Sequence, residues 1–277
     1  MHDLKNFHNY LLAMIPFSKN GMLTIINDRS MFFTDFVMGT LSPFIIQYLL
    51  WSNIFSQQSE SINGFTLNDM MYYYGFALVI SRLNNGYDLI QTFSRHVQNG
   101  ELEVYITKPY GYISQRLFTF FGESILYLLP LFIVFLIKFI TDYPVEKGLS
   151  VFIISVLMII SIIVLSQLLC FFLSFSIAIM SFWVIEYNIL LSFIILSSSL
   201  FGGVLLPPSF WPDWILPLMK YNPFRFIISA PAEFFVKMNS SLFKEVIIGG
   251  VCYLLFFYAF IHSMWKKGIK NYNGAGG

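Results

Sequence analysis

Few residues in this sequence have the type and spacing that chemistry requires. The four histidines, His2, His8, His96 and His262, are scattered and lack the spacing of metal ligands. No Gly-Lys pair occurs, so a nucleotide-binding P-loop is absent, and neither His-Glu-x-x-His nor Gly-x-Ser-x-Gly is found. The sequence therefore predicts no catalytic residue, no metal site and no cofactor bound by this chain.

Four acidic residues, Asp35, Asp69, Glu123 and Glu186, lie within or beside apolar runs. Ionisable groups inside a membrane are costly and are usually kept for function, so these acids are candidates for a transport or catalytic role. The simpler interpretation is that each lies at the end of a membrane helix, where its carboxylate reaches water or caps the helix. Glu186 fits this interpretation least well, because its neighbours (SFWVIEYN) predict that it lies inside a helix.

The composition indicates that the elements positioning these residues lie in a membrane. Hydrophobic residues make up 57% of the chain, which exceeds the roughly 45–50% of soluble domains. The net charge of +1 gives no support for a nucleic-acid partner. Cys170 and Cys252 each lie alone in an apolar run, which predicts buried, unreactive thiols and no disulfide.

We expect an all-α polytopic membrane protein, a single domain over residues 1–277 with six transmembrane helices, because each such helix needs about 20 mainly apolar residues. The fourth and fifth spans meet at an expected hairpin near residues 176–182, since Glu186 is the one charged residue between positions 149 and 212. The expected spans are residues 31–54, 67–86, 118–139, 150–175, 182–205 and 246–265.

Six spans place both termini on the same side of the membrane. Ten of the 16 Lys and Arg residues fall on that side, and positive charge concentrates in cytoplasmic loops. We therefore expect a multi-pass protein of the cell (cytoplasmic or inner) membrane, in contact with membrane lipids, with both termini cytoplasmic.

The spacing of apolar residues within residues 1–30 predicts an amphipathic helix that lies in the membrane interface and is bent at Pro16. A disordered lead-in is the alternative. The apolar residues that recur at steps of four or seven are Phe7, Leu11, Ile15, Met22 and Ile26.

Residues 206–245 are too apolar for a solvated loop and contain too many prolines for a spanning helix. Trp211 and Trp214 are suited to headgroup depth, where aromatic side chains anchor membrane proteins. Short helices that re-enter the outer leaflet fit both features.

Residues 87–117 form a polar segment between the second and third spans, in a chain with 11% charged residues. Gly100 is expected to end a helix that begins near Tyr87, and Pro109 to turn the chain into the third span. The apolar residues between these two breakers, expected to face the membrane, are Leu102, Val104 and Ile106.

The order and spacing of several stretches resemble the ABC-2 type permeases of ATP-binding-cassette exporters, over nearly all of the chain after residue 20. These stretches are NDRSMFFTDFV before the first span, WSNIF at its end, FTLNDMMYYYGF at the second span, NGELEVYITKPYGYISQRL between the second and third, SFWVIEYN at the fifth, and PFRFIISAPAEFF before the sixth.

The resemblance implies a permease subunit that forms half of a translocation path and is paired with a second copy or a paralogous permease. It also implies a separate dimer of ABC ATPase subunits, which bind ATP and Mg²⁺ and contact a cytoplasmic coupling helix within residues 87–117. Relatives often carry an Arg-Asp pair where this chain has Gln98 and Asn99, so the resemblance does not support a charge-paired contact to the ATPase at these two positions. We assign the ATPase contact to Asp88, Arg95, Gly100, Glu101 and Lys108.

We place the path on the second and fifth spans, where aromatic bulk is combined with a few polar groups. Packing or lipid-facing aromatics are an equal alternative, and a non-transporting sensor or immunity subunit fits the same architecture. A membrane-embedded lipid-modifying enzyme fits less well, because no convergent polar site is found. The weakly charged spans suit an amphipathic or hydrophobic cargo. The expected path residues are Tyr72, Tyr73, Tyr74, Phe182, Trp183, Glu186 and Asn188.

Overall fold

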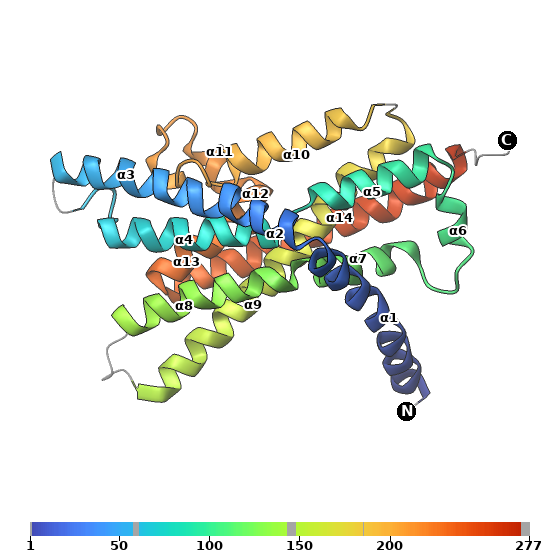
Figure 1. Ribbon diagram of the computed structural model, residues 1–277, viewed down its shortest axis with the longest axis horizontal. Coiled ribbons are helices and arrows are strands. Elements are labelled where there is room, and N and C mark those ends of the chain that lie inside the picture. The colour runs from blue at the N-terminus through green and yellow to red at the C-terminus, as the bar shows by residue number, and fades with distance from the viewer. Residues whose placement is uncertain (1, 58–60, 143–147, 185, 273–277) are drawn as a thin grey trace.

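The computed structural model describes residues 2–57, 61–142, 148–184 and 186–272, and the regular structure in these ranges is helical apart from an isolated bridge between Ile62 and Phe65. Most of the long helices run roughly along the longest axis of the molecule (Figure 1). The start of α1 and the end of α14 lie in the half of the molecule that also carries α5 and α6 (Figure 1).

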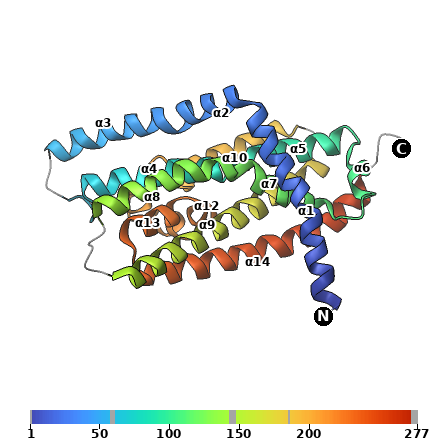
Figure 2. The same ribbon diagram turned by 60° about the horizontal axis from the view of Figure 1, so that its bottom comes forward.

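The first candidate span consists of α2 (Arg29–Phe36), the π-helix η1 (Val37–Leu41) and α3 (Ser42–Gln57). Only 6% of its most apolar window is buried. It lies along the outside of the bundle (Figure 2), with α4 as its main helical neighbour. Lipid or another protein must therefore cover most of its surface.

Helix α4 (Leu67–Leu83) begins at a capping box between Thr66 and Asp69. The Asp69 carboxylate accepts a hydrogen bond from the Thr66 N–H at 3.0 Å, and the Thr66 hydroxyl accepts one from the Asp69 N–H at 3.2 Å. These bonds satisfy two N–H groups at the start of the helix. The prediction that Asp69 serves as a cap is confirmed.

The other candidate spans are α7 (Tyr112–Ser124) with η2 (Ile125–Tyr127) and α8 (Leu128–Asp142), then α9 (Gly148–Ala178) with η4 (Ile179–Phe182), and α14 (Ser240–Asn271). Helix α9 is the most buried of them, at 44% of its most apolar window. It packs against α5, α12, α13 and α14, which makes it the central helix.

Four of the six expected spans are therefore long and apolar enough to cross a membrane. The other two correspond to α4, with 17 residues, and α10 (Asn188–Phe201), with 14. At 1.5 Å per residue these helices are about 26 and 21 Å long, against a hydrocarbon core of about 30 Å. The full six-span layout stays a prediction.

The connection between α10 and α14 contains η5 (Pro208–Phe210), α11 (Leu216–Tyr221), α12 (Pro223–Ile227) and α13 (Ser229–Lys237). Helix α13 packs on α4 and α9, and α12 packs on α9 and α14. The connection thus folds back into the bundle as short helices. Their place in the outer leaflet stays a prediction.

Helix α1 (His2–Asn27) is helical throughout, with Pro16 inside it. It packs on α7 where Gly21 meets Gly122. A Cβ on Gly21 would collide with the carbonyl oxygen of Thr119, and one on Gly122 with that of Ser18, so the two backbones touch. Leu11 and Ile15 of the expected apolar stripe are exposed, while the side chain of Phe7 lies outside the described part of the chain.

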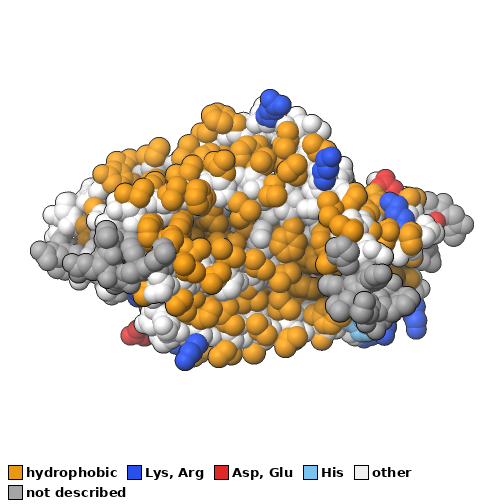
Figure 3. Space-filling view, turned by 90° about the horizontal axis from the view of Figure 1, so that it is seen from below, with side chains coloured by type: hydrophobic (Ala, Val, Ile, Leu, Met, Phe, Trp, Pro, Cys, Tyr) orange, Lys and Arg blue, Asp and Glu red, His pale blue; other side chains and the backbone are white. Residues whose placement is uncertain are grey.

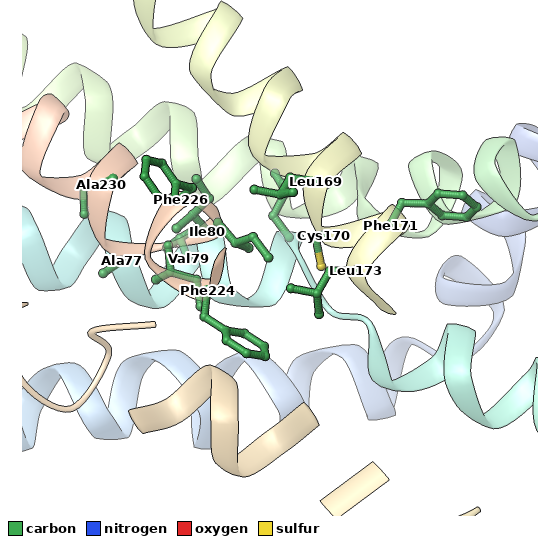
Figure 4. Packing of buried hydrophobic residues seen from close by; sticks show 14 of the residues in the cluster. Ala77, Val79, Ile80, Leu169, Cys170, Phe171, Leu173, Phe224, Phe226 and Ala230 are labelled. Carbon is green, nitrogen blue, oxygen red and sulfur yellow. The ribbon is translucent and has the colours of Figure 1, made fainter. Parts of the chain in front are cut away.

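The core lies where α4, α9, α12 and α13 meet, and Figure 4 labels buried side chains from all four helices. Burial was also expected for Cys252, but this cysteine is exposed. The adjacent Gly249 and Gly250 form the face of α14 that packs on Phe226 and Leu165, so Cys252 lies on another face. Hydrophobic side chains dominate the surface seen in Figure 3, and charged ones lie toward its edges.

Candidate functional site

Helix α5 (Tyr87–Gln98) starts the polar segment and uses one face to attach itself to the bundle. Leu89, Ile90 and Phe93 are buried, and the helix packs on α9, η4 and α10. The helix ends at Gln98, and its C-cap Asn99 is followed, as expected, by Gly100 with a φ of +75°. This left-handed conformation favours glycine because it has no Cβ.

Residues 99–111, which we call the tip, follow α5 and include the short helix α6 (Leu102–Ile106). Leu102 is buried, whereas Val104 and Ile106 are 61% and 42% exposed. The expectation that all three residues face the membrane is wrong for Leu102, which is buried inside the protein. Glu101, Glu103 and Lys108 are exposed beside them, so the tip presents a mixed apolar and charged surface.

Aromatic contacts hold the tip against α5 and α7. The His96 ring stacks on Tyr105 with centroids 4.5 Å apart, and its Nδ1 lies 2.9 Å from the Tyr112 hydroxyl. The Lys108 ammonium lies 4.4 Å from the centre of the Tyr105 ring. Burial lowers the pKa of His96, and so does the positive charge of Arg116, while Glu101 opposes the shift. These contacts favour a neutral imidazole.

Four of the five residues assigned to ATPase contact lie at or beside the tip. Arg95, Glu101 and Lys108 are exposed there, and Gly100 forms the turn. Asp88 lies apart from them, at the start of the 12-residue α5, which spans about 18 Å. The structure thus separates Asp88 from the other four.

Asp88 lines a small polar pocket with Arg82, Glu123 and Tyr127. Desolvation there raises the pKa of Asp88, the negative charge of Asp35 adds to the shift, and Arg116 opposes it. Asp88 is exposed and accepts a hydrogen bond from Asn85 at 3.4 Å, at the edge of this pocket where α4, α5 and α7 meet.

The expected path residues fall into two groups far apart in the fold. Tyr73 and Tyr74 are fully buried and donate hydrogen bonds to the carbonyl oxygens of Gly203 (2.8 Å) and Leu205 (3.3 Å). They attach α4 to the start of the α10–α14 connection. Tyr72 lies beside them, where its hydroxyl contacts Thr141.

The second group lies at the other end of the bundle, near the tip. Phe182 packs against Trp265 of α14, with ring centroids 6.1 Å apart. Trp183, Glu186 and Asn188 are exposed. The expectation that Glu186 lies inside a helix is wrong, because α10 begins only at Asn188. The structure does not bring the two groups together, and their role in transport stays a prediction.

A cavity of about 280 Å³, which we call the central cavity, opens between η1, α4, α9, α10 and α12. None of the seven expected path residues lines it. Its walls are mainly apolar, and its polar side chains come from Ser81, Arg82, Asn84, Asn85, Tyr87, Ser198 and Ser199. Sequence reasoning missed this site, although the stretch RLNNG, which interrupts the apolar pattern between α4 and α5, was a signal for it.

Arg82 connects the central cavity to the small polar pocket, since it lines both. Its Nη1 donates to Asp35 Oδ1 at 3.0 Å and its Nε to the Gly39 carbonyl oxygen at 3.2 Å. The Tyr127 hydroxyl donates to the other oxygen of Asp35 at 2.7 Å. Asp35 is thus part of an ion-pair network between the first, second and third spans.

A second polar site missed by sequence reasoning is the buried Arg225 of α12. Its guanidinium donates to Glu233 at 2.9 Å and to Glu245 at 2.8 Å, with 5% of the side chain exposed. Because the partners lie on α13 and α14, this arginine ties three helices together. The PFRFIISAPAEFF stretch, with one arginine and one glutamate among apolar residues, was the signal.

Comparison of the sequence with protein-family models gives the family of this chain. A family model described as ABC-2 family transporter protein matches residues 41–276, which include α3, the tip, the α10–α14 connection and the lining of the central cavity except Gly39. Comparison with curated proteins gave no match. Because the family model covers most of the chain, this protein belongs to the ABC-2 transporter family.

Proposed function

We propose that the chain is the membrane-spanning subunit of an exporter that is driven by a separate ATPase. Membership of the ABC-2 family supports a transport role, and members of that family work with ABC ATPase partners. In this proposal two permease subunits, identical or paralogous, enclose the path, and both termini and the tip are cytoplasmic. ATP and Mg²⁺ bind to the partner.

The observation that carries the ATPase contact is the surface of the tip. Val104 and Ile106 are exposed next to Glu101 and Lys108, at the end of a helix that is anchored to the bundle through its other face. An apolar centre with a charged rim is the usual anatomy of a protein interface. We therefore place the contact on the tip rather than along the whole of α5.

The proposal is tested by measuring capture of the ATPase. The ATPase that copurifies with the tagged chain is identified by mass spectrometry and coexpressed with variants. Val104→Asp and Glu101→Lys are expected to weaken capture by about tenfold or more, since like charges and buried unpaired charges cost several kcal/mol at an interface. Asp213→Lys, an exposed reversal in the α10–α14 connection, serves as the matched control.

Equal capture by both tip variants and the control would contradict the proposed contact. Reconstitution with the captured ATPase then separates an exporter from a sensor of the same architecture. An exporter moves a fluorescent amphiphile across the vesicle membrane only with ATP, whereas a sensor changes ATPase activity without net movement.

A further inference from the structure

We propose that the central cavity binds an amphipathic anion, with a phosphate or carboxylate head group, a hydroxyl on or beside it, and a short apolar body. That this molecule is the cargo rests on the proposed transport function. The binding site itself rests on the geometry of the cavity.

The cavity has the shape and lining of a ligand site. Its volume of about 280 Å³ is close to the lower end, about 300 Å³, of small-molecule pockets. Leu78, Leu173, Ile194 and Ile227 provide apolar wall from four different helices. Few polar groups in a mainly apolar pocket orient a ligand through its head group.

Arg82 sets the charge of the head group, because among the described residues it is the one charged side chain that lines the cavity. Its bonds to Asp35 and Gly39 use Nη1 and Nε, and Nη2 has no hydrogen-bond partner within the described part of the chain. A third of the side chain, 33%, is exposed. A guanidinium held in place with free donors recognises planar carboxylates and phosphates well.

The neighbouring Asn84 needs a hydrogen-bond donor from the ligand. The residue is 6% exposed, and its Nδ2 donates to the Ser166 hydroxyl at 3.2 Å and to the Ile227 carbonyl oxygen at 3.1 Å. These two bonds fix the orientation of the amide and leave Oδ1 buried with no partner in the described structure. A buried acceptor without a donor costs about 1–3 kcal/mol.

A ligand with both groups satisfies both residues. The O–H of a singly protonated phosphate ester, or the hydroxyl of a hydroxy acid, donates to Asn84, and the anionic oxygens accept from Arg82. An alkylammonium would supply a donor to Asn84 but would be repelled by Arg82. The hydroxyl of a neutral alcohol could accept from the guanidinium and donate to Asn84, but it would form a weaker bond to Arg82 than an anionic oxygen does.

The test uses the full chain in nanodiscs of phosphatidylcholine with three probes of equal chain length: octyl phosphate, octylamine and octanol. The readout is the thermal unfolding midpoint as a function of probe concentration. We expect octyl phosphate to raise the midpoint more than the other two, because ligands that bind the folded state stabilise it.

Two variants test whether the stabilisation by octyl phosphate arises at the central cavity. Ser198→Leu fills the cavity without adding a charge and is expected to abolish the difference between the probes. Arg82→Gln is expected to raise the octyl phosphate concentration for half the shift by about tenfold, as for a lost hydrogen bond to a charged group. Arg29→Gln, at an exposed arginine of α2, is expected to behave like the unmodified chain.

A third comparison, with phosphatidylglycerol added to the nanodiscs, identifies the source of the head group. Stabilisation by this lipid and loss of the further shift with octyl phosphate would assign the site to a membrane lipid. A shift that persists would assign it to a free amphiphile. Both outcomes support an anion site.

An equal shift with octylamine, or an undiminished shift in Ser198→Leu, would overturn the inference. Because the measurement needs no ATPase, it can fail while capture by the tip succeeds. Failure of binding would therefore leave the proposed function standing, and failure of capture would leave the anion site standing.

Discussion

The tip and the α10–α14 connection both interrupt the apolar pattern of this chain, and they differ in where their charged residues lie. The tip exposes its charged residues, whereas the α10–α14 connection buries its arginine among three helices. Arg95 and Arg225 show the difference: Arg95 is exposed beside the tip, whereas Arg225 has 5% of its side chain exposed and bonds to two glutamates.

This difference separates two uses of polar residues in a membrane protein. A buried polar group must be paired inside the protein because desolvation is costly, so its partners report on the fold. An exposed group with few internal partners is free to meet another molecule. The connection therefore serves stability, and the tip is the better candidate for a partner surface.

Among the variants that test this comparison, Arg225→Met is expected to cause the largest loss in the free energy of unfolding. Removing the guanidinium leaves Glu233 and Glu245 without their shared partner, and breaking a buried ion pair costs about 3–5 kcal/mol. We expect the lower end of this range, because Glu245 is 38% exposed. Denaturation of the purified chain in detergent measures the loss.

The matched control for that variant is Arg95→Met, which should change the free energy of unfolding by no more than about 0.5 kcal/mol. Similar losses for the two arginines would show that the tip is as much a part of the folded core as the connection is.

Two asparagines, one in the connection and one in the tip, are expected to differ by a smaller amount in the free energy of unfolding. The Asn222 side chain accepts from the Arg225 N–H at 2.9 Å and donates to the Met219 carbonyl oxygen at 2.8 Å. Asn222→Ala should therefore cost about 1–2 kcal/mol, as for other lost helix caps. Asn99→Ala in the exposed tip should leave the unfolding midpoint nearly unchanged, and an equal loss there would contradict the comparison.

The smallest expected effect is a change with pH in the stability of the contacts that hold the tip against α5 and α7. The pKa of His96 is lowered in the folded chain by burial and by Arg116, so the unfolded tip takes up a proton first as the pH falls below about 6.5. The stability of the tip is therefore complete above that pH and decreases below it. Hydrogen exchange of residues 99–108 at neutral pH and at about pH 5.5 measures the change.

His96→Gln is the control for the pH effect, because glutamine does not titrate in this range. Faster exchange at low pH in both proteins, after correction for intrinsic rates, would assign the effect to another group.

The sequence predicted features that depend on neighbours along the chain. The Asp69 cap lies three residues from Thr66, and Gly100 ends α5 through its own conformation. Both follow from local backbone chemistry. The helix that starts near Tyr87 was found for the same reason.

Features that join distant residues did not follow from the sequence. Asp35 and Arg82 are 47 positions apart, and the walls of the central cavity come from several helices. A helical pattern gives the apolar face of each helix but does not say which helices meet. Glu186 was misplaced because its apolar neighbours favour a helix, whereas the chain turns there between η4 and α10.

The contact of Gly21 with Gly122 gives α1 the geometry of a lever. The 19 residues from His2 to this crossing form an arm about 28 Å long, so a rotation of about 10° moves the helix start by about 5 Å. Tyr10 lies partway along the arm and touches Tyr110 at the base of the tip, with ring centroids 6.0 Å apart. A displacement of the tip would therefore act directly on this arm through the Tyr10–Tyr110 contact.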